Sequence, residues 1–124
     1  NIIGGGDWKK DRIFPDLIRF NFEKKKIKIR SPKSVRPWQH VLDVIRVIKI
    51  VIEYSFDKKR LSGAYNVSPN NQKNDINVND ILNLSKLKKP KIQKSNLKEK
   101  KYLSLDSTKL LKIFKIKNKF NINK

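Results

Sequence analysis

The sequence predicts an α/β fold, because segments with helical periodicity alternate with short strand-like segments along the chain. The chain has 124 residues, which is the length of one domain or of one piece of a domain. Its apolar content of 37% is low, but the apolar residues are grouped in blocks, as in a folded chain rather than a disordered one. The strand-like segments are too few to complete a sheet, so we expect them to form one edge of a larger sheet.

The N-terminal part is expected to be a loop followed by a helix. Residues 1–11 contain Gly4-Gly5-Gly6, and glycines permit both positive φ and a close approach of the backbone to another group. These glycines do not form G-x-G-x-x-G and no strand-then-helix frame surrounds them, so the sequence contains no dinucleotide fingerprint here. Apolar residues at helical spacing predict a helix over residues 11–22, with Pro15 near its start, where the missing N–H is tolerated.

The middle of the chain is expected to contain a short strand and a long helix. Residues 27–30 alternate between apolar and basic side chains, as a strand does. In residues 42–56, polar side chains recur three or four positions apart on an otherwise apolar cylinder, which predicts a largely buried helix. Residues 63–69 are read as a further strand, and residues 70–74 as the loop after it.

Two shorter helices are expected in the C-terminal part. The first covers residues 77–87, and the second covers residues 108–114 with Asp106 or Ser107 as its N-cap. Residues 88–98 form a basic connector between them, and residues 102–106 are extended. The side chains expected to point inward from the first of these helices are Ile81, Leu82 and Leu84.

Composition excludes several classes of function. The chain has no cysteine, so it contains no disulfide framework, zinc ribbon or thiol nucleophile. Its 31 Lys and Arg against 11 Asp and Glu give a net charge of +20, which is compatible with nucleic-acid binding. However, most basic residues are Lys, Asn and Ile are abundant, and no docking module is present, so we interpret the charge as compositional drift at exposed positions. The longest apolar block, residues 41–52, is interrupted by charges, so no segment is expected to span a membrane.

Three strings carry a resemblance to a known family. They are Asn1-Ile2-Ile3-Gly4-Gly5-Gly6-Asp7-Trp8, Asp11-Arg12-Ile13-Phe14-Pro15-Asp16 and Val35-Arg36-Pro37-Trp38-Gln39-His40-Val41-Leu42. In this order and spacing they resemble the CDP-glucose 4,6-dehydratases, which are extended short-chain dehydrogenase/reductases of the NAD-dependent epimerase/dehydratase family. The likeness continues through Tyr65-Asn66-Val67 and the pattern Glu99…Tyr102-Leu103…Leu105-Asp106.

The resemblance implies that the chain is a C-terminal portion of such an enzyme. Residues 1–124 would form the sugar-nucleotide-binding part, with a Rossmann-like sheet edge plus a small substrate-binding domain. The NAD-binding N-terminal part would be absent, and residues 115–124 would be a divergent tail rich in Lys and Asn. The first residue is not Met, which fits the expectation of a fragment.

The resemblance also implies the chemistry of the parent enzyme. It would be a lyase that uses bound NAD to convert CDP-glucose into CDP-4-keto-6-deoxyglucose and water. The parent would be a cytoplasmic homodimer in deoxysugar biosynthesis for lipopolysaccharide O-antigen. The family's catalytic Tyr-x-x-x-Lys lies upstream of this chain. Tyr54 and Lys58 match that pattern at the wrong place, so we predict no catalytic residue here and no activity of the chain alone.

Six substrate contacts, to CDP-glucose or a related sugar nucleotide, follow from the resemblance: Asn1, Arg12, Ile13, Arg36, Asn71 and Glu99. Arg36 is the main candidate for binding the diphosphate, because its planar guanidinium meets phosphate oxygens two at a time. It lies between Pro32 and Pro37 in a stiff segment. The alternative is that Arg36 stacks on Trp38. We expect the single histidine, His40, to be a structural hydrogen bonder between loop and helix.

Two other functions remain open from the sequence. A basic module for nucleic acid or anionic surfaces would bind any duplex with a steep dependence on salt. An inactive remnant would neither fold nor bind, and would lack helix in a circular dichroism spectrum.

Overall fold

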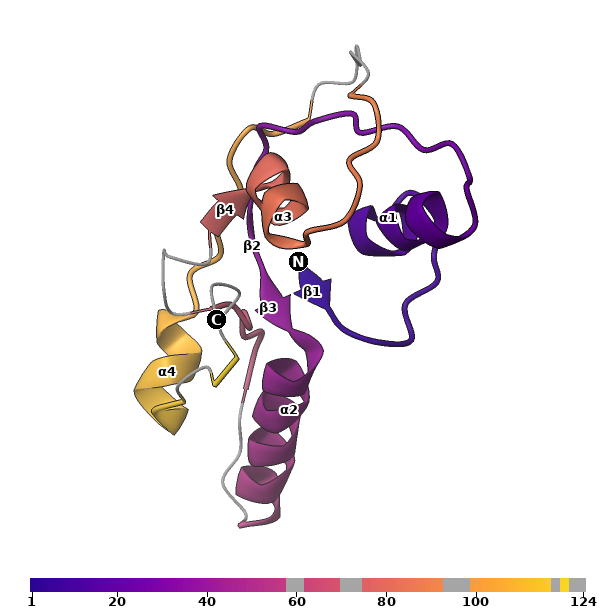
Figure 1. The fold of residues 1–124 in the computed structure, drawn as a ribbon. Coiled ribbons are helices and arrows are strands. Elements are labelled where there is room, and N and C mark those ends of the chain that lie inside the picture. Colours follow the sequence, from indigo (N-terminus) through magenta and orange to yellow (C-terminus); the bar gives the residue numbers. More distant parts are fainter. Residues whose placement is uncertain (58–61, 70–74, 93–98, 117–118, 121–124) are drawn as a thin grey trace.

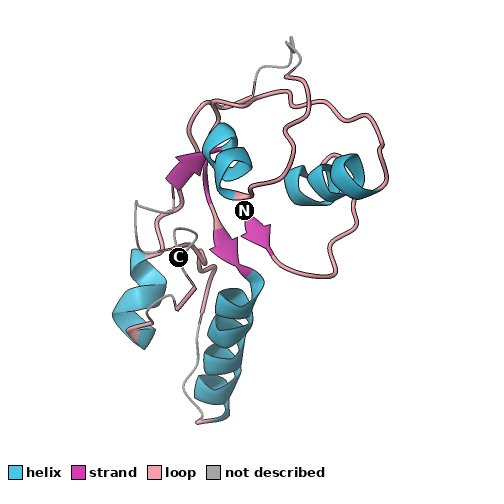
Figure 2. Ribbon diagram, viewed as in Figure 1, coloured by secondary structure: helices cyan, strands magenta, loops and turns pink. Residues whose placement is uncertain are grey.

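The computed structural model describes residues 1–57, 62–69, 75–92, 99–116 and 119–120. The elements follow one another as β1 (Ile2–Ile3), α1 (Ile13–Phe22), β2 (Val35–Pro37), β3 (Gln39–His40), α2 (Val41–Phe56), β4 (Asp75–Asn77), α3 (Val78–Leu84) and α4 (Thr108–Phe114). This alternation of strands and helices confirms the α/β class (Figure 2). No helix in the described part of the chain is long and apolar enough to cross a membrane.

The strands form two small sheets that share one stretch of chain. β1 pairs with β3 in parallel, with Ile2 opposite Gln39. β2 pairs with β4 in antiparallel, with Arg36 opposite Ile76. Since only Trp38 separates β2 from β3, the two sheets are continuous through residues 35–40. Figure 1 shows α1 and α3 on one side of this strand region, and α2 and α4 on the other.

The positions of the strands differ from the sequence prediction. Residues 1–11 were expected to be a loop, but the chain enters as β1. In residues 27–30 only Ile29 pairs, through a single bridge to Ile92. The predicted strand at residues 63–69 does not form. A segment this short forms a strand only where the backbone of another segment lies beside it. The alternation of apolar and polar residues within the segment does not show whether such a partner is present.

Helix α2 confirms the prediction of a helix over residues 42–56, but not the prediction that it is largely buried. One face of α2 packs against α4, around a core made of Val47, Leu110 and Ile116. The opposite face leaves half or more of each of four apolar side chains exposed: Ile45, Ile48, Ile52 and Phe56. An apolar surface on both faces is typical of a helix covered on both sides. The described residues cover only one of them.

A second core lies between α1 and α3. Its buried members are Leu17, Ile29 and Leu82. The start of α3 is closed by a capping box, in which Asn77 and Asp80 each accept the other's backbone N–H. Ile81 and Leu82 are buried as predicted, whereas Leu84 is 47% exposed, so the prediction that Leu84 points inward is wrong.

The last helix has the predicted bounds. Ser107 occupies the N-cap position without a side-chain capping bond. Instead, the Asp106 carboxylate accepts the backbone N–H of Thr108 at 2.8 Å. Hydrogen bonding from the side chain of Thr108, together with this backbone bond, stabilises the charged form and holds the pKa of Asp106 below its usual value.

Candidate functional site

A cavity of about 480 Å³ lies between β1, α1 and β2. Its lining comes from stretches of chain that are far apart in the sequence: residues 1–18, residues 34–38, Val78 and Glu99. Five of the six predicted contacts line it: Asn1, Arg12, Ile13, Arg36 and Glu99. The sixth, Asn71, lies outside the described residues. The fold therefore brings the described members of the predicted set to one place.

Arg36 is held firmly at the wall of this cavity. It lies on β2, and its side chain is only 14% exposed. Nη1 donates to the carbonyl oxygens of Val35 at 2.8 Å and of Lys100 at 2.9 Å. Nη2 lies 3.5 Å from the nearer carboxylate oxygen of Glu99. The guanidinium thus has a defined place, set by two backbone acceptors and one carboxylate rather than by Trp38.

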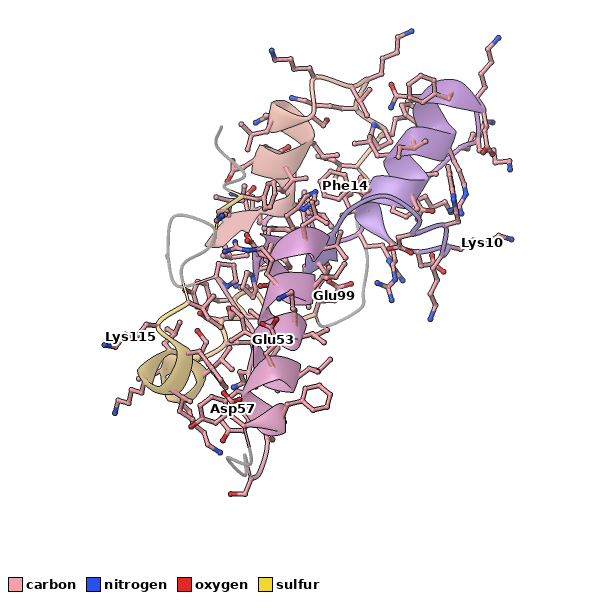
Figure 3. The ribbon with its side chains drawn as sticks, turned by 90° about the horizontal axis from the view of Figure 1, so that it is seen from below. Lys10, Phe14, Glu53, Asp57, Glu99 and Lys115 are labelled. Carbon is pink, nitrogen blue, oxygen red and sulfur yellow. The ribbon has the colours of Figure 1, made fainter. Side chains whose placement is uncertain are left out.

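An aromatic pair forms part of the apolar lining of the cavity. Trp38 is 2% exposed, and its indole N–H donates to the carbonyl oxygen of Ile76 at 2.9 Å. Its ring meets Phe14 edge to face, with 6.0 Å between centroids. Figure 3 labels Phe14 and Glu99, which both line the cavity. Sequence reasoning missed Trp38 as a lining residue, although it lies in the string that carried the resemblance.

The second arginine of the cavity is Arg12, at the N-cap of α1. A cation is unfavourable near the positive end of a helix unless an anion accompanies it. Here Asp7 supplies that anion, with its carboxylate 3.6 Å from Nη1. Asp11 also lines the cavity. Neither aspartate was predicted, and the signal available was their place beside the glycine run and Arg12. Ile13, the first residue of α1, both lines the cavity and packs on the core around Leu17.

The glycine run serves the packing of the protein itself. A Cβ on Gly4 would lie 2.3 Å from Cγ1 of Val41, so only glycine allows β1 to approach the start of α2 this closely. Asn1 is held in the same region, because its carbonyl oxygen accepts the N–H of Gln39 at 2.9 Å. The predicted close approach of the glycine backbone to another group is thus confirmed, and that group is the side chain of Val41.

Two residues singled out by sequence have structural roles. His40 is the N-cap of α2, and its Nδ1 accepts the N–H of Leu42 at 3.2 Å, which confirms the predicted hydrogen bond between loop and helix. Tyr54 packs edge to face on Phe114, at 5.1 Å between centroids, and does not line the cavity. Lys58 lies outside the described residues. In the described part of the chain, no group of three His, Asp or Glu side chains could hold a metal ion.

The residues around the glycine run do not fit a dinucleotide. Such a site needs a helix N-terminus directly after the glycines, where amide groups meet the phosphates. Here β1 ends at Ile3 and α1 begins only at Ile13. Val41 also occupies the space beside Gly4.

Comparison with solved structures defines the class of this fold. The chain superposes on MoeE5 in complex with UDP-glucuronic acid and NAD, with a TM-score of 0.75 and 16% identity over 98% of this chain and 40% of that one. It superposes on dTDP-glucose 4,6-dehydratase from Bacillus anthracis in complex with NAD, with a TM-score of 0.72 and 21% identity over 97% of this chain and 38% of that one. A UDP-glucuronic acid 4-epimerase from Bacillus cereus gives a TM-score of 0.70 and 21% identity, over 90% of this chain and 36% of that one. The chain therefore shares the α/β fold of part of each of these three proteins.

A curated relative makes the likeness more specific. CDP-glucose 4,6-dehydratase from Salmonella typhimurium is 38% identical over 73 residues. The match covers 58% of this chain and 20% of that enzyme. No family model matches the chain. The resemblance inferred from the strings around Gly4, Arg12 and Arg36 is confirmed, and it relates this chain to a minor part of the relative's length.

Proposed function

We propose that this chain is the sugar-nucleotide-binding part of an enzyme like CDP-glucose 4,6-dehydratase, and that its cavity binds the nucleotide and diphosphate of CDP-glucose. The observation that carries the proposal is the meeting of Asn1, Arg12, Ile13, Arg36 and Glu99 around one cavity. These residues come from three distant parts of the sequence. The 38% identity to a CDP-glucose 4,6-dehydratase supports CDP-glucose as the proposed ligand.

The chemistry of the cavity suits a diphosphate. Arg36 offers a planar fork whose position is set before the ligand arrives, which lowers the ordering cost of binding. Arg12 offers a second guanidinium, and Asn1 an amide donor. Phe14 and Trp38 add an apolar wall against which part of the nucleoside would pack.

We further propose the arrangement of the parent enzyme. NAD would be held by the N-terminal part of the parent enzyme, and the poor fit of the residues around Gly4 to a dinucleotide supports this assignment. The hydride chemistry of a dehydratase belongs to that cofactor, whereas this chain binds and orients the substrate. The parent would be a cytoplasmic homodimeric lyase of deoxysugar biosynthesis, and this chain alone would not turn over CDP-glucose. Residues 115–124 would be its divergent tail.

Isothermal titration with CDP-glucose tests the proposal directly. The full chain should bind CDP-glucose, and Arg36→Ala should weaken binding about tenfold or more, because a charge-assisted contact to phosphate is lost. Lys49→Ala is the matched control, since it removes a cation from an exposed position of α2 away from the cavity lining. Titration with UDP-glucose and dTDP-glucose measures the selectivity for the base. The proposal fails if the folded chain binds none of these, or if Arg36→Ala leaves affinity unchanged.

A further inference from the structure

We infer that Glu99 is a displaceable counter-ion of Arg36: it holds the position beside the guanidinium that a phosphate of the ligand takes, and it leaves when the ligand binds. This inference rests on the proposed function and changes the role of one residue in it. Resemblance placed Glu99 among the substrate contacts. The geometry points instead to a carboxylate that competes with the substrate for the same cation.

The contacts of the pair show which partner moves. Nη1 of Arg36 donates to the carbonyl oxygens of Val35 and Lys100, so the guanidinium cannot swing away without losing both of these hydrogen bonds. Glu99 contacts Nη2 at 3.5 Å, longer than a good charge-assisted hydrogen bond. Its side chain is 38% exposed, against 14% for Arg36. Glu99 can therefore turn into solvent at small cost while Arg36 stays in place.

Arg36 should bind a phosphate more strongly than it binds Glu99, which favours displacement of the carboxylate. A partly exposed ion pair of this length changes an equilibrium constant by about fivefold or less. A phosphate offers the same guanidinium two oxygens at shorter distance and with more charge. The diphosphate is thus the stronger partner, and Glu99 lowers its net affinity by the free energy needed to separate the pair.

The second arginine of the cavity repeats the arrangement. Arg12 lies 3.6 Å from Asp7, and both line the same cavity as Arg36 and Glu99. Both arginines among the described lining residues are thus paired with a carboxylate of the protein before binding. A ligand must separate such pairs to bind, so the cavity favours a diphosphate over ions with less charge, such as a monophosphate.

The test is a double-mutant cycle on the full chain with CDP as the probe. Isothermal titration compares the wild type, Glu99→Gln, Arg36→Ala and the double variant. We expect Glu99→Gln to bind CDP about three- to fivefold more tightly than the wild type, because the competing carboxylate is gone. In the Arg36→Ala background the same change should alter affinity by less than about twofold. The gain in affinity caused by Glu99→Gln should be greater for CDP than for CMP.

The control is Glu53→Gln, which removes the same charge from an exposed ion pair on α2 (Figure 3) and should leave CDP affinity unchanged. Glu99→Ala should tighten binding in the same direction, so it replaces Glu99→Gln if that variant does not fold by circular dichroism. Weaker CDP binding by the Glu99 variants would overturn the inference and make Glu99 a ligand contact, with the proposed function intact. The inference would also be overturned if Glu99→Gln raised the CDP affinity equally in the wild-type and Arg36→Ala backgrounds. The gain would then come from the lower negative charge of the protein and not from release of Arg36. If the folded wild type binds no CDP, the proposed function fails and the inference fails with it.

Discussion

The carboxylate of Asp43 accepts the backbone N–H of Phe120 at 3.1 Å, although 77 positions separate the two residues. The other carboxylate oxygen accepts the N–H of Lys119 at 3.1 Å and a hydrogen from Arg46 at 3.0 Å. Asp43 is 3% exposed, and the Phe120 ring stacks on His40 with 4.8 Å between centroids. The described end of the chain is thus fastened to the first turn of α2.

Replacing Asp43 by Ala should lower the free energy of unfolding by about 2–4 kcal/mol, because the donors of Arg46, Lys119 and Phe120 would lose the buried charged acceptor that they share. Urea unfolding followed by circular dichroism measures the change. Glu53→Ala is the control: its ion pair with Lys49 is exposed, so the change should stay within about 0.5 kcal/mol. An Asp43→Ala chain as stable as the wild type would show that this contact does not hold the C-terminal residues.

Two neighbouring glycines should respond differently to the same substitution. Gly4→Ala places a methyl group against Val41 and should destabilise the chain by about 1–3 kcal/mol. Gly5→Ala meets no atom within 4 Å and should be neutral or slightly stabilising. Thermal unfolding of both variants measures the difference. Equal effects would contradict the close contact between β1 and α2.

The exposed face of α2 should tolerate charge. In Ile48→Lys/Ile52→Lys, both changes fall on side chains that are about half exposed, so the free energy of unfolding should change by less than about 1 kcal/mol. Sedimentation velocity should show less self-association, because an exposed apolar patch is removed. Val47→Ala, on the buried face, should cost about 1–3 kcal/mol in urea unfolding. Strong destabilisation by the lysine variant would mean that this face is covered.

Acid should weaken the start of α4 through Asp106. Its pKa in the folded chain is lowered, chiefly by hydrogen bonding to Thr108. Its contribution to stability is therefore present above the unfolded value of about 3.9 and is lost as the pH falls through the lower folded value. In melting curves from pH 6 to pH 2.5, Asp106→Ala should lose less Tm than the wild type over the acid part of this range. Parallel curves for the two proteins would refute this role.

Helices were predictable because their signal is contained within each segment. The spacing of polar residues located α2, and the capping residues before Thr108 located α4 within its observed bounds. Strands were not predictable to the same degree. β4 pairs with β2 and β1 pairs with β3, and in each case the partner lies 35 or more positions away.

The candidate site was predictable by residue type but not by arrangement. The resemblance carried by the strings around Arg12 and Arg36 singled out the two arginines, and a planar guanidinium suits a diphosphate; their contact with a ligand stays a prediction. Asp7 and Trp38 were missed, since an aspartate beside glycines and a tryptophan beside proline have many structural uses. Nothing in the linear sequence shows that Glu99 lies beside Arg36 rather than facing a ligand.

The sequence by itself determined the α/β class, the helices, the absence of thiol chemistry and the likeness to a sugar-nucleotide dehydratase. These follow from periodicity, composition and short strings, which are properties of neighbouring residues. Only the tertiary structure decided that five of the candidate residues line one cavity and that Asp43 holds Phe120. It also decided that the described residues cover one apolar face of α2 and leave the other exposed. Such relations join residues far apart in the chain, and they arise when backbone pairing and packing bring those residues together.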